Sequence, residues 1–392
     1  MDDLSDVLLG LMVAAFLGHV FTLLRWRRGW NKSNLVPMDP NRESKTQATA
    51  FEVVVPVRNE AQHIGTLLDD LKASLGPMTV RVWVVDDWSD DDTVRVAKSH
   101  PLAPEVVSLS AITSQGKPQR GKKSALLAGI EHASSPWVVT LDADVRLGPG
   151  WGPAWQRGLA LIDETCGAVA GPVRLWTGNQ SGRWAEVQAL DYAAQMGWSA
   201  AALAHGQPAS ASGANFAVRR STYPDTRSLG ASGDDALVVQ SLHRQGLEVS
   251  WLSDQNAIVS TDGALDLVEW THQRMRWAGK AKHYSFHAKR TAAWVMVAGL
   301  MPLVWTSWWG MAPSWTRAWT AVCFWVVWNA MNVAYVRPVA QWFGLPHPWQ
   351  AWWRLAWSQP LQLPFLVLAS WGWLSPWGIA SKPQWKGRTC TT

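Results

Sequence analysis

The chain has 392 residues, of which 48% are hydrophobic and 17% charged, and its net charge is +5. This length allows two domains, or one domain with a membrane part. The basic residues form no single tract, which argues against a nucleic-acid partner. The 30 tryptophans favour a membrane location, since the indole ring is apolar while its N–H needs a partner. The cysteines, Cys166, Cys323 and Cys390, lack metal-ligand spacing and fit a reducing cytoplasm.

The first apolar run, Val7–Leu24, is just long enough to cross a bilayer. Acidic residues precede it and three arginines within residues 25–28 follow it, which is the reverse of a cleaved signal peptide. We therefore expect a transmembrane signal anchor over residues 1–30, with the part that follows it in the cytoplasm. A buried core helix is the alternative. The polar composition of residues 31–50 predicts a tether.

An alternation of strands and helices starts at residue 51. Phe51–Val57 predicts a strand, Ile64–Leu75 a helix, and Val80–Val85 a second strand. Strands that alternate with helices across short connections form a right-handed, doubly wound, mostly parallel α/β sheet. Ligands bind such sheets at the carboxyl ends of the strands, so we expect the functional groups there.

Two acids, Asp86 and Asp87, stand at the carboxyl end of the second strand. A carboxylate at this place can accept a hydrogen bond from a ribose hydroxyl or a base N–H. The alternative is that the acid-rich segment is a solvated helix N-terminus, where the helix dipole favours negative charge.

A loop rich in Gly, Pro and Lys, Ser110–Lys123, leads into a helix that we predict over Ser124–His132. Lys122 and Lys123 oppose the dipole at a helix start, so they indicate a bound anion, for which a phosphate is the obvious candidate. A basic surface loop without a ligand is the alternative.

The stretch Trp137–Val145 predicts a buried strand that ends in two aspartates, Asp142 and Asp144. Carboxylates so placed suit Mg²⁺ or Mn²⁺ held against a diphosphate, with water and phosphate oxygens completing the shell. A solvated turn after the strand is the alternative.

A later acid, Asp235, precedes a helical stretch over Ala236–Arg244, and there the helix dipole keeps a carboxylate ionised. A single carboxylate is enough to take the proton from an attacking hydroxyl. The alternative is that Asp234 and Asp235 are only an N-cap pair.

A further helix is expected to start at Thr261 or Asp262. On it Gln273, Arg276 and Trp277 fall on one face, which suits a diphosphate below and a sugar ring above. The same segment also fits an interfacial helix over about 264–286, with its cationic side chains near lipid head groups. Those side chains are Arg274, Arg276, Lys280 and Lys282.

The C-terminal part carries three apolar stretches near spanning length, Ala292–Met311, Ala318–Val336 and Leu355–Trp373. We expect transmembrane or interfacial helices within residues 291–378 and a basic tail over 379–392. Three spans place the basic tail outside, against the positive-inside trend, so the topology of the tail stays open.

Six motifs in this order resemble family 2 glycosyltransferases of the GT-A fold. The motifs are VVVPVRNE (Val53–Glu60), VVDDWSDDDT (Val84–Thr93), GKKSALLAGI (Gly121–Ile130), LDADV (Leu141–Val145), ASGDDALVVQSLHRQG (Ala231–Gly246) and HQRMRW (His272–Trp277). The last resembles the Q-x-x-R-W signature of membrane-embedded members such as cellulose and hyaluronan synthases and ceramide glucosyltransferase. One departure is Leu127, where many relatives have Asn. The catalytic domain implied by this resemblance covers residues 51–290.

The resemblance implies a role for each matched residue. Asp235 would be the catalytic base with Asp234 beside it, and Asp142 and Asp144 would hold the metal. Donor binding falls to Pro56, Arg58, Glu60, Asp86, Asp87, Lys122, Lys123 and Asp142. Diphosphate and acceptor binding falls to Gln273, Arg276, Trp277, Gly213 and Asn215. The segments Trp176–Gly197 and His205–Ala217 are less periodic, and we expect the acceptor channel there.

The sequence therefore predicts an inverting, Mg²⁺- or Mn²⁺-dependent glycosyltransferase that uses a nucleotide sugar, with a UDP-sugar favoured, and a lipid or growing glycan as acceptor. It would be a multi-pass membrane protein with its catalytic domain facing the cytoplasm. A processive polysaccharide synthase of the same fold is one alternative. A nucleotidyltransferase and a non-catalytic membrane scaffold are alternatives from other classes. The oligomeric state is not predicted.

Overall fold

The computed structural model describes most of the chain. The described residues are 2–34, 49–114, 117–118, 120–176, 183–208, 210–225, 234–279, 285–311, 314–345, 368, 384–385 and 388–389. Most of the expected tether lies outside these residues, and so does the third expected C-terminal span, Leu355–Trp373, except for residue 368.

A central sheet of seven strands has the order β11-β8-β10-β6-β1-β2-β3. Its strands are β1 (Phe51–Val57), β2 (Val82–Asp86), β3 (Glu105–Ser108), β6 (Trp137–Leu141), β8 (Cys166–Ala170), β10 (Asn215–Arg219) and β11 (Glu248–Trp251). Only β10 runs antiparallel to its neighbours β6 and β8, and the other pairs are parallel. The predicted mostly parallel α/β sheet is therefore confirmed, with β6 ending directly before Asp142.

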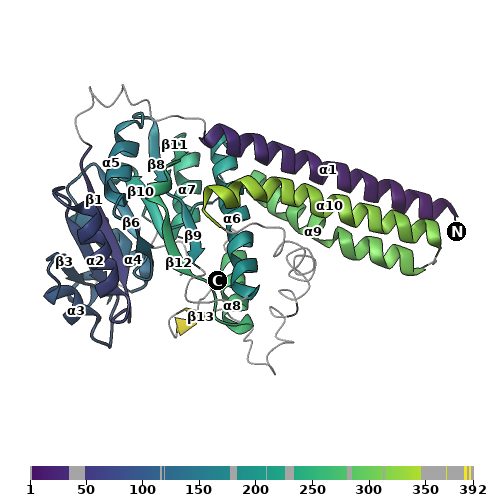
Figure 1. Cartoon of the computed structure of the whole chain (residues 1–392). Helices are drawn as coiled ribbons and strands as arrows, with labels where there is room; N and C mark the ends of the chain where they lie inside the picture. The colour runs from purple at the N-terminus through teal and green to yellow at the C-terminus, as the bar shows by residue number, and fades with distance from the viewer. Residues whose placement is uncertain are drawn as a thin grey trace.

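Helices pack on both faces of this sheet (Figure 1). They are α2 (Ile64–Leu75), α3 (Thr93–Ser99), α4 (Lys122–His132), α5 (Trp151–Ala160) and α7 (Asp234–Arg244). Side chains of β1 alternate between two cores, because successive residues of a strand point to opposite faces. Val53 and Val55 pack with α2 and α5, whereas Val54 packs with α4. A strand buried on both faces explains the unbroken apolar run from which β1 was predicted.

A buried carboxylate holds the start of β1, at the opposite end from the expected site. Glu52 is 2% exposed and accepts hydrogen bonds from Trp83 Nε1 at 2.5 Å, Ser134 N at 3.0 Å and Ser135 N at 2.9 Å. Burial by itself raises the pKa of Glu52, but these hydrogen bonds outweigh it and hold the pKa at about 2.

A second, three-stranded sheet was not predicted. It has the order β7-β12-β9 and consists of β7 (Arg146–Leu147), β12 (Val259–Asp262) and β9 (Val173–Trp176). Thr261 and Asp262 therefore end a strand, and the expectation that they start a helix is wrong. The helix α8 (Leu267–Gly279) begins five residues later, where Asp266 Oδ1 accepts from Glu269 N at 2.8 Å, as an N-cap does.

A long helix, α6 (Arg183–Ala204), occupies most of the segment that was expected to be irregular. Side chains from Val187, Leu190, Tyr192 and Ala200 are all buried, and they belong to two different cores. A helix that is buried around most of its circumference has no polar face, so its sequence lacks the amphipathic period by which helices are recognised.

Single turns and short strand pairs complete the described structure. They are η2 (Leu109–Ala111), η3 (Arg220–Thr222), η4 (Gln255–Ala257), β4 (Thr113–Ser114), β5 (Lys117–Pro118), β13 (Gln384–Trp385) and β14 (Arg388–Thr389).

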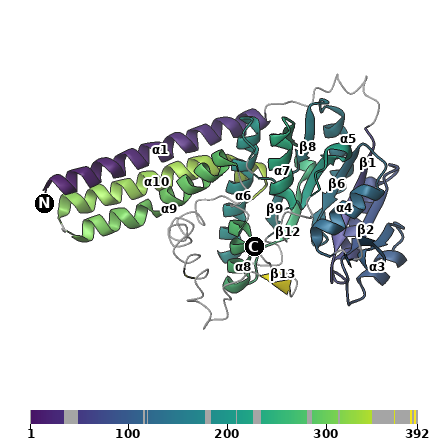
Figure 2. The same ribbon diagram turned by 180° about the vertical axis from the view of Figure 1, so that it is seen from behind.

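Three long helices form a bundle that projects from the α/β domain (Figures 1 and 2). They are α1 (Asp2–Asn34), α9 (Phe286–Met311) and α10 (Trp315–Trp342). By length and composition, two stretches of the described helices, Leu9–Ser33 and Trp315–Trp342, are apolar enough to cross a membrane. Large apolar side chains are exposed along the bundle, including Leu11, Leu17, Phe21, Val304, Trp319 and Val326. Exposed apolar surface on this scale marks a membrane or protein contact.

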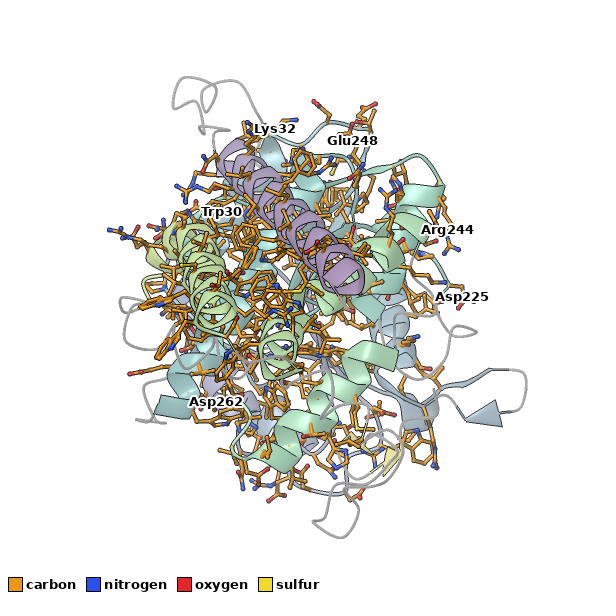
Figure 3. The ribbon with its side chains drawn as sticks, turned by 90° about the vertical axis from the view of Figure 1, so that its right-hand side faces the viewer. Trp30, Lys32, Asp225, Arg244, Glu248 and Asp262 are labelled. Carbon is orange, nitrogen blue, oxygen red and sulfur yellow. The ribbon has the colours of Figure 1, made fainter. Side chains whose placement is uncertain are left out.

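The bundle joins the domain through α6, against which small residues allow a close approach. An added Cβ at Gly29 of α1 would lie 2.8 Å from Ala201 Cβ, and one at Gly197 would lie 2.8 Å from Val339 Cγ2. Lys32 Nζ donates to Ala204 O at 2.9 Å, and in Figure 3 Lys32 marks the end of α1 that reaches the domain. One helix therefore packs against the bundle as well as against β9 and β11 of the domain.

Candidate active site

The second strand ends in the two predicted acids, which have different surroundings. Asp87 is 1% exposed, accepts from Gly121 N at 2.8 Å and lies 3.9 Å from Arg58 Nη1. Burial raises the pKa of Asp87, and the Gly121 hydrogen bond and Arg58 oppose that rise. Asp86 Oδ1 accepts from Ser89 N at 3.1 Å, so it fixes the turn that follows the strand.

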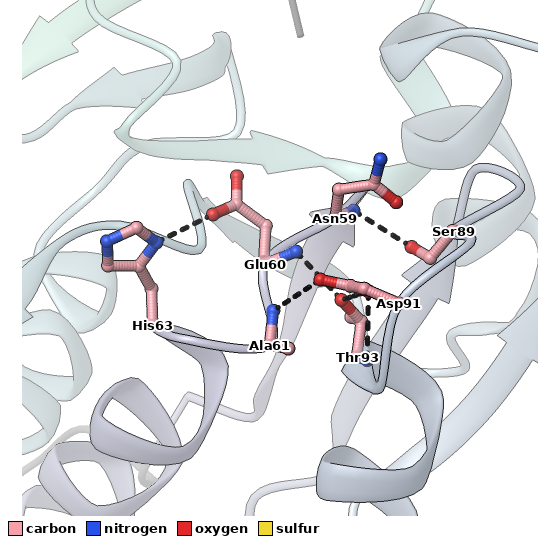
Figure 4. Close-up of polar contacts among 7 residues, drawn as sticks. All are labelled: Asn59, Glu60, Ala61, His63, Ser89, Asp91 and Thr93. Carbon is pink, nitrogen blue, oxygen red and sulfur yellow. Dashed lines mark hydrogen bonds and ion pairs between the residues drawn. The ribbon is translucent and has the colours of Figure 1, made fainter.

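Hydrogen bonds connect the loops after β1 and β2 (Figure 4). Asn59 N donates to Ser89 Oγ at 3.0 Å, and Glu60 N donates to Thr93 Oγ1 at 2.7 Å. The carboxylate of Glu60 lies 2.9 Å from His63 Nδ1. These contacts hold the two loops against each other. They place Glu60, predicted for the donor, in an internal pair.

Of the other predicted donor residues, Pro56 is half-buried within β1 opposite Val85. Lys122 and Lys123 are the first two residues of α4, as expected, although the helix starts two residues earlier than predicted. Lys122 Nζ lies 2.7 Å from Asp142 Oδ1, so the basic loop and the strand end are joined. Lys123 is 5% exposed.

The aspartates after β6 fit an open metal site. Asp142 is half-buried and Asp144 exposed, while Ala143 between them is buried. Both are hard oxygen ligands, and Mg²⁺ and Mn²⁺ are commonly held by one or two carboxylates with phosphate oxygens and water. No group of three or more His, Cys, Asp or Glu side chains suited to a metal occurs among the described residues. The donor set therefore fits an ion that shares its ligands with a substrate.

The predicted base, Asp235, is held by two backbone N–H groups at the start of α7. Its Oδ1 accepts from Ala236 N at 2.7 Å and its Oδ2 from Gly213 N at 3.1 Å. Such donors stabilise the ionised carboxylate and fix its direction. The neighbouring Asp234 begins α7, and its side chain lies outside the described residues.

Gly213 thus contacts the predicted base, whereas Asn215 has an internal role. The Asn215 side chain is fully buried. It accepts from Trp151 and Trp155 at 3.2 and 3.1 Å and donates to two backbone carbonyls, both at 2.9 Å. These four bonds use the side-chain amide inside the protein, so the expectation that Asn215 contacts the acceptor does not match its surroundings.

Tyr192 of α6 lies among the acidic groups and was missed by the sequence analysis. Its hydroxyl donates to Ser212 Oγ at 3.2 Å. Burial, followed by the charges of Asp235 and Asp142, raises its pKa to about 12. The charges of both carboxylates thus act on the Tyr192 phenol, which stays protonated. The sequence did not indicate this position, because Tyr192 is a single tyrosine in a segment without hydrophobic periodicity.

The helix α8 brings Trp277 to the same region, with its ring 6.0 Å from that of Tyr192. Gln273 is half-buried, and the side chain of Arg276 lies outside the described residues. Arg274 differs from the lipid-facing alternative. It pairs with Asp191 of α6, and its guanidinium lies 4.8 Å from the Trp277 ring centre. Arg274 therefore faces the protein interior, because it pairs with Asp191 on α6. A local sequence pattern does not indicate a partner on a distant helix.

The site therefore consists of connected groups around the carboxyl ends of β1, β2 and β6. Asp87 contacts Arg58 and the N–H of Gly121, the next residue, Lys122, pairs with Asp142, and the charges of Asp142 and Asp235 both act on Tyr192. A phosphate-bearing ligand at Lys122 would meet a cation and the N-terminus of α4.

Comparisons with known proteins show the family of the α/β domain. Residues 52–223 match the family described as "Glycosyl transferase family 2". A 4,4'-diaponeurosporenoate glycosyltransferase of Staphylococcus aureus (strain USA300) is 38% identical over 96 residues, 24% of each chain. An undecaprenyl-phosphate 4-deoxy-4-formamido-L-arabinose transferase of Sodalis glossinidius is 30% identical over 99 residues, 25% of this chain and 29% of the relative. The chain thus spans about a quarter of the length of these curated relatives.

A solved structure has the same fold. The mannosyltransferase PcManGT from Pyrobaculum calidifontis, in complex with GDP-Man and Mn²⁺, has a TM-score of 0.52 and 18% identity. The match covers 91% of this chain and 97% of that one. Residues 52–223, which carry Asp87, Lys122, Asp142 and Gly213, therefore form a glycosyl transferase family 2 domain, and the solved structure shows the GT-A fold for the chain.

Proposed function

We propose that the chain is an inverting, divalent-metal-dependent glycosyltransferase that moves a sugar from a nucleotide-sugar donor to a membrane lipid or a growing glycan. The observation that carries this proposal is the pairing of Lys122, at the start of α4, with Asp142, directly after β6. Asp235, with its two N–H donors, is a separate carboxylate, and the charges of Asp142 and Asp235 both act on Tyr192.

On the donor side, Lys122 and the N-terminus of α4 bind and orient the diphosphate, because both favour negative charge. Asp142 and Asp144 are the residues that would hold Mg²⁺ or Mn²⁺, and the ion supplies Lewis-acid neutralisation of the leaving diphosphate. The presence of Mn²⁺ and GDP-Man in the complex of PcManGT supports this assignment.

On the acceptor side, Asp235 takes the proton of the attacking hydroxyl. The Gly213 and Ala236 N–H groups hold the carboxylate toward the site. Only one carboxylate is needed for direct displacement of the diphosphate, and a single displacement inverts the anomeric carbon, as in one-step inverting glycosidases. Trp277, next to Tyr192, gives the sugar ring an aromatic face.

The bundle supports an acceptor at the membrane. Apolar side chains are exposed along α1 and α10, and their two apolar stretches are long enough to cross a bilayer. The names of both curated relatives refer to lipid-soluble molecules. We infer that the domain faces the cytoplasm, with the arginines after Leu24 on that side, and that a UDP-sugar is the favoured donor.

The test is release of nucleoside diphosphate by the full chain in lipid nanodiscs. UDP-, GDP- and other nucleotide sugars are offered with lipid extract as acceptor, with Mn²⁺ or Mg²⁺, and then with a chelator. Release from one donor that the chelator abolishes is expected. Release of pyrophosphate would instead indicate a nucleotidyltransferase. Nucleotide binding to the same sample is measured as well, and metal-independent or absent binding would favour a non-catalytic membrane scaffold. Long polymer as product would indicate a processive synthase.

A further inference from the structure

A proline removes one hydrogen bond from the interior of α10, and a side chain of α1 replaces it. Pro338 lies inside the helix and has no N–H, so the carbonyl of Ala334, four residues earlier, loses its usual partner within the helix. Arg27 Nη1 of α1 donates to Ala334 O at 2.8 Å. Freed carbonyls in membrane helices are satisfied by neighbouring helices in this way. The bond therefore fixes the Arg27 guanidinium on the surface of α10.

A second arginine, Arg337, belongs to the same part of the surface. It follows Ala334 by three residues in α10, and both are exposed. Because helical side chains lean toward the N-terminus of their helix, that of Arg337 covers the turn around Ala334. The helices α1 and α10 are in contact at this level, where the ring centres of Trp26 and Tyr335 are 5.6 Å apart. One guanidinium from each helix therefore lies at a single exposed place.

No carboxylate of the bundle compensates for this positive charge. The sequences of α9 and α10 contain no Asp or Glu, and that of α1 contains none after Asp6, at the opposite end of the helix. A guanidinium has five N–H donors, of which the bond to Ala334 uses one in Arg27. Two cations placed together repel each other. The arrangement therefore favours a bound anion with several acceptor oxygens.

The two arginines lie just beyond the apolar surface of the bundle, at the end that reaches the α/β domain (Figures 1 and 2). Among the described residues of these helices, the last exposed large apolar side chains are Leu24 in α1 and Val327 in α10. Arg27 is three residues past Leu24, about 5 Å along the helix. A bilayer around the apolar surface therefore places its headgroups at Arg27 and Arg337.

The exposed face of α10 continues from the arginines along the apolar part of the bundle. Val326, Ala330, Ala334 and Arg337 are all exposed, and they follow one another at helical spacing, so they form one stripe. Between Val326 and Arg337 this stripe carries only alanines, whose small side chains leave room for an acyl chain against the helix. The stripe thus leads from an apolar surface to a cationic one, as a phospholipid requires.

We propose that Arg27 and Arg337 bind the headgroup phosphate of an anionic phospholipid from the surrounding bilayer, with an acyl chain along Ala330 and Ala334. The inference rests on the membrane location in the proposed function. Guanidinium groups match phosphate oxygens with paired N–H donors. A zwitterionic headgroup carries its own cation, which the two arginines repel. The site therefore selects phosphatidylglycerol over phosphatidylcholine.

The test is native mass spectrometry of the full chain in neutral detergent. The protein is titrated with phosphatidylglycerol and with phosphatidylcholine of the same acyl chains, and bound lipids are counted. We expect the first phosphatidylglycerol to bind at least about fivefold tighter than the first phosphatidylcholine, which is the gain expected from one cation near an anionic lipid. Equal affinity for the two lipids, or binding of neither, would overturn the inference.

Variants locate the site. Arg337→Gln should lose about fivefold in affinity for phosphatidylglycerol and keep its affinity for phosphatidylcholine and its melting temperature. Arg27→Ala should lose phosphatidylglycerol affinity and also melt at a lower temperature, because Ala334 O then lacks a donor. The matched control is Arg95→Gln, which removes the same charge from an exposed arginine of α3 paired with Asp92, and it should bind both lipids like the wild type.

Two results would refute the site. One is an unchanged affinity of the Arg337→Gln protein for phosphatidylglycerol. The other is an equal loss in Arg95→Gln, since that would mean a general effect of net charge. Nucleotide release in phosphatidylcholine nanodiscs separates this inference from the proposed function. Turnover of a donor with equal binding of the two lipids would overturn the lipid site alone, whereas a preference for phosphatidylglycerol without turnover of any donor would support the lipid site and contradict the proposed function.

Discussion

Replacing Tyr192 by Phe is expected to slow sugar transfer without weakening donor binding. The phenol donates to Ser212 Oγ at 3.2 Å, and the next residue, Gly213, donates its N–H to Asp235 Oδ2 at 3.1 Å. Since the pKa of Tyr192 is raised to about 12, by burial first and then by nearby carboxylates, the phenol remains a donor at physiological pH. It therefore positions the loop that orients the base.

The size of the effect follows from one hydrogen bond. A neutral hydrogen bond contributes about 1 kcal/mol net. If the lost bond raises the barrier to transfer by that amount, kcat falls roughly fivefold. Because the phenol does not touch the Lys122 and Asp142 pair in any described hydrogen bond, the affinity for nucleotide should not change.

A matched control exists on the opposite side of the same helix. Tyr335 of α10 is also buried, and its hydroxyl donates to Ala194 O of α6 at 3.0 Å. Tyr335→Phe removes a similar bond between α6 and the bundle. It should lower the stability of the protein by a similar amount, about 1 kcal/mol, and leave kcat unchanged.

The assay is steady-state donor turnover in nanodiscs, with kcat and KM determined separately and nucleotide Kd measured on the same samples. Thermal unfolding reports the stability of both variants. A Tyr192→Phe protein with wild-type kcat would refute the positioning role. So would equal losses of kcat in the two variants, since that would mean a general effect of loosening α6.

Three further outcomes are expected. Asp144→Asn should abolish metal-dependent nucleotide binding, whereas Asp235→Asn should keep binding and lose transfer. Calorimetry measures nucleotide binding and a turnover assay measures transfer for both variants. Equal loss of binding in the two variants would contradict this division of roles. Because the pKa of Glu52 is depressed to about 2 from 4.5, its stabilising effect is complete above pH 4.5 and is lost as pH falls toward 2. Glu52→Gln should therefore be less stable than the wild type by about 1 to 3 kcal/mol at pH 7. This difference in the free energy of unfolding should shrink as the pH falls. A difference that does not change with pH would contradict the prediction. Gly29→Ala should destabilise the protein by about 1 to 3 kcal/mol through overpacking against α6. Gly10→Ala is the control and should not destabilise the protein, because nothing lies within 4 Å of an added Cβ there. Equal melting temperatures of the two variants would argue against close packing between α1 and α6.

The strands that carry the site could be predicted because parallel strands buried on both faces are continuous apolar runs. The run of β1 was predicted with its bounds, and that of β6 ended only four residues earlier than expected. The acids come directly after these strands, so the sequence also predicted that the acids lie at one edge of the sheet.

The rest could not be predicted, because it depends on contacts between distant segments. The long helix α6 has no amphipathic period, since it is enclosed by the sheet and the bundle. Arg274 turns inward only because Asp191 and Trp277 are there to receive it. The left-handed backbone of Trp88 is fixed by the neighbouring loop after β1, and a Trp at that position indicates no such turn.

The most direct test of the central claim is the anomeric configuration of the product. With a donor identified by nucleotide release, the linkage in the purified product is assigned by NMR. The account, in which Asp235 is a single base opposite the diphosphate, predicts a sugar whose configuration is inverted relative to the donor. Retention of configuration would contradict it, because retention requires a second nucleophile or a different mechanism.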